Sequence, residues 1–284
     1  MLIGVVGGGT VGRATARCFM EHAEVKVFDT NIHRRTHTLA ETLKSDLVFV
    51  CLPSPQKPNS LECDTSFIDD FFASHKGSQT NFVLRSTVPI GTTRWLRETY
   101  NLPNIVHSPE FLTARCAVTD AQVPARNVIG FISNPPKTEH IRDDLGDLVI
   151  NYPTSICYRI VRRLYEERFP GIPVHVMSPE ESEAVKLVQN SFFAVKVAFF
   201  NEARSLADKL NLDWDRILAA VLADGRIAHA HTRVPGPDGK YGFGGTCLPK
   251  DLANFTACLR AAGCNSEAVA LAAYQRNIYD RDKA

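Results

Sequence analysis

The chain has 284 residues, of which 44% are hydrophobic, and its formal net charge is +1. This balance is typical of a globular protein with one large core or two modest ones, and the sequence shows no basic stripe with interleaved aromatic residues that would indicate nucleic-acid binding. No apolar run has membrane-spanning length, no signal peptide is recognised before the first strand, and the eight cysteines show no zinc-ligand spacing. We therefore expect a cytoplasmic protein with reduced thiols, no membrane contact and no metal.

The first predicted element is a short apolar strand within residues 1–6 that leads into the pattern G-x-G-x-x-G. In this pattern Gly7 allows a tight turn, and Gly9 lets the backbone approach a pyrophosphate. Gly12 lets the helix that is predicted over 11–21 pack closely on the strand. The order strand, glycine turn, helix therefore predicts a dinucleotide site.

A second strand is predicted over 25–28, and it ends at an acidic residue, Asp29. About twenty residues after a glycine turn, such a carboxylate can hold both ribose hydroxyls of an adenosine. It would also repel the 2′-phosphate of NADP, although the positive side chains that follow, His33, Arg34 and Arg35, oppose that repulsion. The sequence therefore predicts NAD as the cofactor, in preference to NADP.

Strands and helices continue to alternate after this point. Further strands are predicted at 47–52, 82–85, 104–107, 127–131 and 174–176. Helices are predicted at 66–74, at 91–100 and within 151–168, and a loop is predicted at Pro135 and Pro136. This β-α-β repetition predicts the α/β class, with a doubly wound Rossmann sheet that binds ligands at the carboxyl ends of its strands.

The pattern changes at Pro179, after which only helices are predicted, at 180–210, 214–223, 248–262 and 267–281. The first contains no Gly or Pro, and at about thirty residues it is long for a globular helix, which implies a connection between domains or subunits. We expect an NAD-binding domain over 1–177, a helical domain over 178–284 that carries the catalytic cysteine, and a homodimer built on the long helix and the helices after it. The apolar residues around this helix have more surface than one small domain can cover, as with Phe192, Phe193, Val197 and Phe200.

The segment 241–251 reads Y-G-F-G-G-T-C-L-P-K-D and places one cysteine between a glycine-rich approach and a predicted helix start. Three glycines within four positions let the backbone pass close to a ligand, and Pro249 suits a first helical turn. Cys247 would then lie at the positive end of a helix and next to Lys250, and both influences favour the thiolate. A loop-to-helix turn without a function could carry the same glycines and proline.

Taken together, these features resemble the UDP-glucose/GDP-mannose dehydrogenase family, from residue 1 to about residue 281. The resemblance is carried by the glycine fingerprint and by the segments 86–91 (STVPIG), 108–112 (SPEFL), 183–190 (EAVKLVQN), 201–202 (NE) and 242–251 (GFGGTCLPKD). Members of this family oxidise the primary alcohol of a sugar nucleotide to a carboxylate, with two NAD molecules and a covalent thioester. The resemblance therefore implies NAD as cofactor and a nucleotide sugar as substrate.

The family chemistry agrees with the residue types present. An aldehyde needs a nucleophile before it can yield a second hydride, and Cys247 would supply one by forming a thiohemiacetal that is oxidised to a thioester. Lys186 and Asn190 lie four residues apart, on one helix face, and could donate to the developing alkoxide, or Lys186 could be a surface lysine beside a core stripe. Asp251 could act through water as a base or orient Lys186, and it could also be a favourable carboxylate in a first helical turn.

The resemblance implies further site residues. Glu110 would guide the hydrolytic water, and Thr87 would bind that water or the cofactor. Arg226 matches an arginine that reaches the sugar bound by a neighbouring subunit, and a solvated loop arginine is the alternative. Cofactor-binding residues are expected at Gly7, Gly9, Thr10, Val11, Gly12, Asp29, Pro53, Thr87 and Lys250. Substrate-binding residues are expected at Phe111, Leu112, Arg226, Tyr241 and Gly244.

Two departures from the family pattern accompany the match. Family members usually carry a second glutamate four residues after the one at Glu110, where this chain has Ala114, and that position belongs to the thioester hydrolysis machinery. The family also continues into a second Rossmann-like domain that grips the nucleotide half of the substrate. This sequence stops at Ala284, which is compatible with a fragment or with a natural short form.

Two other functions stay open at this stage. A two-electron β-hydroxyacid-type dehydrogenase shares the layout and a helix lysine and asparagine, but it needs no cysteine, so the segment 242–251 argues against it. A NAD-sensing or scaffold protein without activity is the other alternative. The joint presence of Cys247, Lys186, Asn190 and Asp251 argues against that reading.

Overall fold

The computed structural model describes residues 1–132, 140–142, 148–150, 156–264 and 267–282. The loop expected at Pro135 and Pro136, and the first residues of the stretch 151–168, lie outside these ranges. The chain divides into two compact units. The first comprises Met1–Ser54 and Thr65–Lys186, and the second comprises Pro55–Asp64 and Leu187–Ala284.

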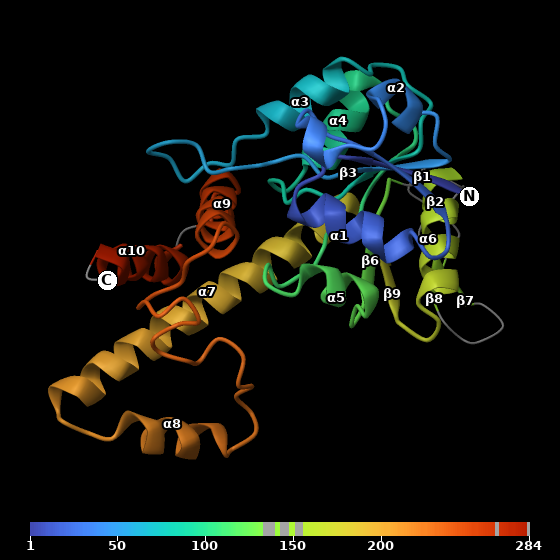
Figure 1. The fold of residues 1–284 in the computed structure, drawn as a ribbon. Helices are drawn as coiled ribbons and strands as arrows, with labels where there is room; N and C mark the ends of the chain where they lie inside the picture. The colour runs from blue at the N-terminus through green and yellow to red at the C-terminus, as the bar shows by residue number, and fades with distance from the viewer. Residues whose placement is uncertain (133–139, 143–147, 151–155, 265–266, 283–284) are drawn as a thin grey trace. The chain divides into compact units, whose positions relative to one another are not determined.

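The first unit is built on a seven-stranded sheet with the strand order β2-β1-β3-β4-β5-β6-β9 (Figure 1). Its strands are β1 (Leu2–Val6), β2 (Glu24–Phe28), β3 (Leu47–Val50), β4 (Phe82–Leu84), β5 (Ile105–His107), β6 (Asn127–Gly130) and β9 (Val174–Met177). Neighbouring strands are parallel except for β5 and β6, which are antiparallel. Every residue of β3, β4, β5 and β6 is buried, as expected for strands that are covered on both faces. Two further strands, β7 (His140–Arg142) and β8 (Leu148–Ile150), pair with each other in a separate two-stranded sheet.

Helices cover both faces of this sheet, and each face has its own apolar core. The helices are α1 (Thr10–Phe19), α2 (Leu39–Thr42), α3 (Ser66–Ala73), α4 (Thr92–Tyr100), α5 (Ala117–Gln122) and α6 (Ile156–Arg168), with a 3-10 turn at Ile32–Arg34. α1, α5 and α6 pack on one face, where Phe19 stacks on Phe49 and on Tyr165. α3 and α4 pack on the other face, around Phe72 and Phe82. The predicted doubly wound α/β fold is therefore confirmed.

The strands β7 and β8 and the 3-10 turn were not predicted from the sequence, and two further features of this unit were also missed. The helices α2 and α5, of four and six residues, are too short to display an apolar period; α2 is recognisable only by the capping box of Thr38 and Glu41. The direction of β6 is the other feature, because it runs antiparallel to β5 although the order of elements reads as regular β-α-β repetition.

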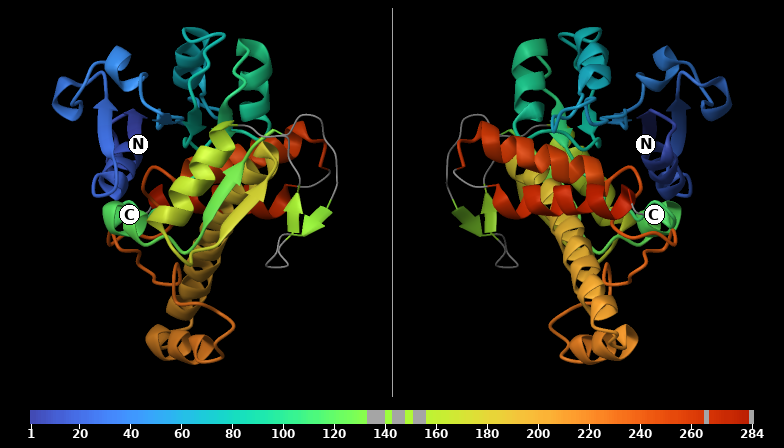
Figure 2. Two further views of the ribbon diagram at one scale, coloured as in Figure 1. Left: turned by 90° about the vertical axis from the view of Figure 1, so that its right-hand side faces the viewer. Right: turned by 90° about the vertical axis from the view of Figure 1, so that its left-hand side faces the viewer.

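The second unit is helical, as predicted, and contains α7 (Pro179–Lys209), α8 (Trp214–Leu222), α9 (Leu248–Ala261) and α10 (Ala268–Asp282). The chain passes from the first compact unit to the second within α7, after Lys186. The functional domain boundary that was predicted between residues 177 and 178 stays a prediction. α9 and α10 lie side by side (Figure 2). Small side chains such as Ala194, Ala198 and Ala273 form the core that these helices share with α7, and they allow the helices to approach closely. Within the described ranges, no helix has both the length and the hydropathy of a membrane span.

A short segment between β3 and α3 belongs to the helical unit rather than to the sheet. Gln56 Nε2 donates to the Tyr274 hydroxyl at 3.0 Å and to the Ser60 carbonyl oxygen at 2.6 Å. Lys57 and Glu62 pair across the segment at 2.8 Å. Residues 55–64 therefore pack with α10, although the chain enters and leaves this segment from the first unit.

Candidate active site

The glycine turn after β1 has the local shape that a dinucleotide site requires. Gly7 has φ +97°, and a Cβ there would lie 2.4 Å from the carbonyl oxygen of Cys51. A Cβ at Gly12 would lie 1.7 Å from the Gly7 carbonyl oxygen, so α1 can pack on the turn only with glycine there. A Cβ at Gly9 would meet no atom within 4 Å, which leaves an open face at the N-terminus of α1. A pyrophosphate could approach this face, because helix N-termini favour anions.

Asp29 lies directly beside this turn. Its carboxylate accepts hydrogen bonds from the backbone N–H of Gly8 at 2.6 Å and of Asn31 at 2.7 Å. The acid that was predicted to bind the ribose therefore also fastens the glycine turn to the end of β2. The other predicted cofactor residues of this region follow β1 and β3 at the same edge of the sheet: Thr10 and Val11 begin α1, and Pro53 follows β3.

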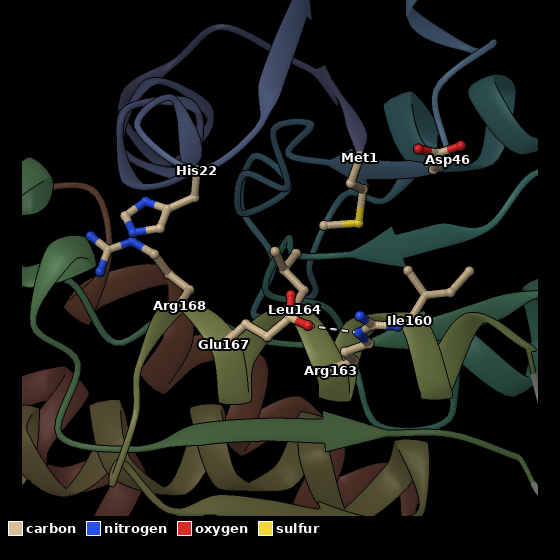
Figure 3. Close-up of a pocket in the computed structure, with 8 residues that line it drawn as sticks. All are labelled: Met1, His22, Asp46, Ile160, Arg163, Leu164, Glu167 and Arg168. Carbon is tan, nitrogen blue, oxygen red and sulfur yellow. Dashed lines mark hydrogen bonds and ion pairs between the residues drawn. The ribbon is translucent and has the colours of Figure 1, made fainter.

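A pocket of about 590 Å³ lies at the opposite edge of the sheet (Figure 3). Met1 and Asp46, which line it, directly precede β1 and β3, so the pocket lies at the amino ends of these strands. α6 forms another wall, where Arg163 pairs with Glu167 at 2.7 Å. Dinucleotides bind at the carboxyl ends of such strands, so this pocket is distinct from the candidate site.

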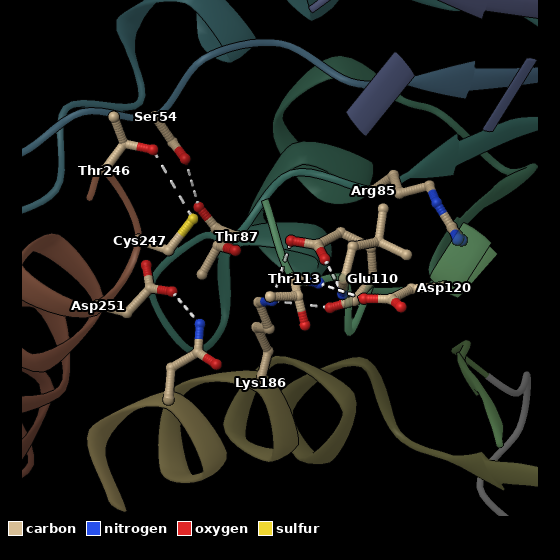
Figure 4. Close-up of polar contacts among 12 residues, drawn as sticks. Ser54, Arg85, Thr87, Glu110, Thr113, Asp120, Lys186, Thr246, Cys247 and Asp251 are labelled. Atoms are coloured by element: carbon tan, nitrogen blue, oxygen red, sulfur yellow. Dashed lines mark hydrogen bonds and ion pairs between the residues drawn. The ribbon is translucent and has the colours of Figure 1, made fainter. Parts of the chain in front are cut away.

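Lys186 and Glu110 form a buried ion pair at the carboxyl end of β5 (Figure 4). Lys186 is 2% exposed, and its Nζ donates to the Glu110 carbonyl oxygen at 2.8 Å and to the Glu110 Oε1 at 2.9 Å. The alternative of a surface lysine is therefore wrong. Burial raises the pKa of Glu110, but the Lys186 charge and the hydrogen bond from the Leu112 N–H outweigh it and hold this pKa below its ordinary value.

A layer of polar side chains, some buried and some partly buried, borders this ion pair. Arg85 Nη1 donates to the Tyr165 hydroxyl at 3.0 Å and to the Ser108 carbonyl oxygen at 3.3 Å. His107 Nδ1 lies 2.8 Å from Ser182 Oγ, and burial lowers the pKa of His107 to about 3, so the ring is neutral at physiological pH. Neither Arg85 nor His107 was predicted. The available signal was a polar residue that ends an apolar run, as in V-L-R and I-V-H.

Thr87 and Phe111 lie in the same region of the first unit. The Thr87 carbonyl oxygen, after β4, accepts a hydrogen bond from Ser54 Oγ, after β3, at 2.6 Å. The Phe111 ring lies 4.0 Å from the Arg126 guanidinium carbon and 5.8 Å from Lys186 Nζ, measured to the ring centroid. The carboxyl ends of three neighbouring strands therefore hold predicted cofactor, catalytic and substrate residues.

In the second unit, Cys247 is the N-cap of α9, and Pro249 lies in the first turn as predicted. Asp251, in the same turn, is 1% exposed. Its Oδ2 accepts a hydrogen bond from Asn190 Nδ2 at 2.6 Å, and its Oδ1 pairs with Lys250 Nζ at 2.5 Å. Four residues predicted for the site therefore gather around the first turn of one helix.

The approach to this helix is closely packed on one side. Thr246 Oγ1 lies 3.8 Å from Cys247 Sγ. A Cβ at Gly244 would lie 2.3 Å from Arg281 Nη2, so only glycine fits there without a shift of the arginine. Tyr241 is partly buried against the small core that contains Trp214.

Arg226 lies apart from these residues, on the surface of the second unit. Its side chain is 87% exposed, and it pairs with Asp224 at 2.5 and 2.7 Å. This is the environment of a solvated loop arginine, and the role toward a neighbouring subunit stays a prediction.

Comparison with known proteins assigns both units. Residues 26–143 match the NAD binding domain of the UDP-glucose/GDP-mannose dehydrogenase family, and residues 180–277 match the central domain of the same family. The chain is similar to UDP-glucose 6-dehydrogenase of Campylobacter jejuni, with 32% identity over 232 residues, 80% of this chain and 53% of that protein. The chain therefore spans about half the length of that relative.

Among solved structures, a UDP-glucose dehydrogenase from Pyrobaculum islandicum matches 98% of this chain with a TM-score of 0.79 and 25% identity, over 68% of its own length. A 3-hydroxyisobutyrate dehydrogenase from Mycobacterium tuberculosis matches 99% of this chain and 94% of its own, with a TM-score of 0.70. At 18% identity this second likeness concerns the fold alone. The two family matches together cover more than half of the chain and include Glu110, Asn190 and Cys247, and the chain therefore belongs to the UDP-glucose/GDP-mannose dehydrogenase family.

Proposed function

We propose that this protein oxidises the primary alcohol of a nucleotide sugar to a carboxylate, with NAD as hydride acceptor and Cys247 as covalent nucleophile. The observation that carries the proposal is the position of Cys247 at the N-cap of α9, one turn before a buried carboxylate, Asp251, that Asn190 and Lys250 hold. Family membership supports the substrate class. UDP-glucose is the first compound to test, because two similar proteins are named as UDP-glucose dehydrogenases.

The glycine turn and Asp29 would hold NAD, and two NAD molecules bound one after the other would each accept one hydride. The first transfer, with loss of the hydroxyl proton, converts the alcohol to an aldehyde. The Cys247 thiolate then adds to the aldehyde carbon, and the resulting alkoxide takes up a proton to give a thiohemiacetal. Loss of a second hydride and of the hydroxyl proton leaves a thioester on Cys247. Water then breaks the C–S bond, which releases the carboxylate and restores the thiol.

The charged residues divide the remaining tasks. Lys186 donates to the oxygen that develops negative charge, because its Nζ is a buried cation, and Asn190 lies one turn further along the same helix. Glu110 accepts a proton from the hydrolytic water, and its lowered pKa keeps it ionised for this role. Asp251 acts through water as a base toward the Cys247 thiol.

The test is the number of NADH molecules formed per sugar, measured with a panel of UDP- and GDP-sugars. The wild-type protein should form two NADH per sugar oxidised. Cys247→Ala should form one at most, because an aldehyde cannot enter the second oxidation without a nucleophile. Cys247→Ser should stall, because a serine ester forms and breaks less readily.

The control is Cys258→Ala, which removes a cysteine three turns further along the same helix and should keep both oxidations. Retention of two NADH per sugar by Cys247→Ala would refute the thioester mechanism. This chain has Ala114 where family members usually carry a second glutamate of the hydrolysis machinery. If hydrolysis of the thioester is slow for that reason, intact-mass measurement of the wild-type protein during turnover should reveal a sugar-sized adduct on Cys247.

A two-electron oxidation of a 3-hydroxy acid is the second candidate. It is favoured by the layout of a Rossmann sheet followed by helices, in which Lys186 and Asn190 lie four residues apart on α7. This function predicts one NADH per substrate, activity with 3-hydroxyisobutyrate but not with nucleotide sugars, and full activity in Cys247→Ala. An inactive scaffold would bind NAD and form no NADH with either class.

We also propose a cytoplasmic homodimer that forms through α7. Five large apolar side chains of this helix are 51% to 63% exposed, and they follow one another at intervals of four, seven, seven and four residues: Val188, Phe192, Phe199, Leu206 and Leu210. Such spacing places them on one helix face. Of the residues first expected around this helix, Phe192 belongs to this stripe, whereas Phe200 packs inward against Trp214.

A further inference from the structure

The segment that leads to Cys247 is held by two buried asparagines from different helices. Asn201, on α7, accepts a hydrogen bond from the backbone N–H of Gly242 through its Oδ1 at 2.9 Å. Asn277, on α10, accepts one from the next backbone N–H, that of Phe243, at 2.6 Å. The two asparagines are 1% and 8% exposed. Two consecutive backbone amides of one loop are thus held by two asparagines that lie 76 positions apart in the sequence, on α7 and on α10.

The surroundings of these contacts leave the segment little freedom. Gly242 has φ +71°, and a Cβ there would lie 2.5 Å from Asn277 Oδ1. Its carbonyl oxygen accepts a hydrogen bond from Arg281 Nη2 at 3.3 Å, while Arg281 Nη1 pairs with Asp238 at 2.7 Å. The Phe243 side chain is 3% exposed in the core of α7, α9 and α10. Glycine is therefore required for the segment to reach the asparagine.

The position of Asn277 within its helix is also informative. It continues the buried face of α10 that begins with Ala270 and Ala273. An apolar residue would fill this place without the cost of burying an amide, and that cost is offset only where the amide is hydrogen-bonded. The bond that Asn277 accepts goes to the loop and not to a neighbouring helix. Its effect is therefore to fix the loop.

We propose that Asn277, together with Asn201, is a positioning residue that sets the place of the Cys247 thiol. Three residues separate Phe243 from Cys247, and the first turn of α9 is fixed beyond it, where Asn190 donates to Asp251. The thiol thus lies between two anchored points. This proposal rests on the proposed function, in which Cys247 is the nucleophile.

The test compares Asn277→Leu with Asn277→Asp, which keeps an acceptor oxygen for the Phe243 N–H. The rate of Cys247 alkylation by iodoacetamide is measured from pH 6 to 9 by peptide mass spectrometry, alongside kcat and the KM for NAD. In Asn277→Leu the pH profile of Cys247 alkylation should shift while the exposed Cys116 and Cys264 keep theirs. kcat should fall by up to about 100-fold, as expected for a reacting group displaced by about 1 Å, with the KM for NAD unchanged. Asn277→Asp should restore most of kcat.

The matched control is Asn254→Leu, which removes another buried asparagine of the same unit, on α9, whose Oδ1 faces Cys258 Sγ at 3.7 Å. The proposal would be overturned if the Cys247 alkylation profile and the kcat of Asn277→Leu matched those of Asn254→Leu. If Asn277→Leu does not fold, Asn277→Ser replaces it and is judged by the same comparison. Failure of the proposed function is seen separately, as two NADH per sugar from Cys247→Ala, whereas the alkylation profile reports the position of the thiol without any turnover.

Discussion

Lys186 and Glu110 carry opposite charges inside the first unit, with 2% and 7% of their surfaces exposed. Burying two charges costs solvation free energy that their attraction only partly returns, so a buried ion pair is weak evidence for stability. Removing one partner is nevertheless costly, because the other charge stays buried without compensation. The pair therefore stabilises the fold little, but the loss of one partner should be measurable. The small net stabilisation agrees with a role of the pair in the reaction rather than in folding.

At this scale we predict the effect of Lys186→Met. The free energy of unfolding at pH 7 should fall by about 3 to 5 kcal/mol, because Glu110 is left as an unpaired buried carboxylate. The lowered pKa of Glu110 in the wild type means that its stabilisation is present above the unfolded-state pKa and is lost as the pH falls through the folded-state pKa. In Lys186→Met, protonation of Glu110 removes the cost of burying an unpaired carboxylate. The difference in the free energy of unfolding between the wild type and the variant should therefore shrink from pH 7 to pH 4.

Urea denaturation at several pH values measures this difference. Lys196→Met is the control, because Lys196 lies on the same helix in an exposed contact with the Ala228 carbonyl oxygen and should change stability by no more than about 0.5 kcal/mol. If the loss of unfolding free energy in Lys186→Met stayed constant with pH, it could not be caused by the unpaired charge of Glu110, and the prediction would be contradicted.

At the scale of elements, Glu183 of α7 closes the N-terminus of α4. Its Oε2 accepts a hydrogen bond from the Gly91 N–H at 2.6 Å. Its Oε1 accepts hydrogen bonds from the Thr93 N–H at 2.8 Å and from the Thr93 hydroxyl at 2.6 Å. Gly91, at φ +96°, offers no side-chain cap, so a residue from a distant helix satisfies the amides that begin α4. Burial nevertheless outweighs these hydrogen bonds and raises the pKa of Glu183 to about 7.

This arrangement predicts an unusual pH dependence for Glu183→Gln. A carboxyl whose folded-state pKa is raised contributes stability that is present below the unfolded-state pKa and is lost as the pH rises through the folded-state pKa. Relative to Glu183→Gln, the wild type should therefore lose stability between about pH 4 and pH 7, by about 3 kcal/mol in total. Thermal unfolding at pH 5 and pH 8 tests the sign. Glu180→Gln, which removes the partner of Arg94, should show no such trend between these values, and a trend of equal size there would contradict the prediction.

At the scale of the whole molecule, the exposed stripe on α7 predicts that the protein associates with a second copy. Phe199→Glu and Leu206→Glu place charges on two residues that are 63% and 61% exposed, so they should disturb the monomer fold little and abolish association. Light scattering at micromolar concentration should report a halved mass. Val123→Glu is the control, because it adds the same charge to an exposed apolar site of the first unit and should leave the mass unchanged. A monomeric wild-type protein would refute the homodimer.

The features that depend on neighbours in the chain could be predicted from the amino-acid sequence. Apolar periodicity predicted the long helices and the strands of the sheet to within a few residues, since each is specified by residues close in sequence. The glycine spacing around Gly9 and the run from Tyr241 to Asp251 predicted the turn and the helix start that carries Cys247. These are local backbone requirements, so they can be read without knowledge of the tertiary structure.

Contacts between side chains that are far apart in the sequence could not be predicted, and they become visible in the folded chain. Lys186 reaches Glu110, which is 76 residues away, and Asn277 of α10 reaches Phe243 in the loop before α9. Likewise, the direction of β6 and the packing of residues 55–64 with the helical unit were not predictable. The physical reason is common to all of them. Each depends on how separate segments pack to bury their apolar surfaces and satisfy their polar groups, and no local pattern of residues encodes that choice.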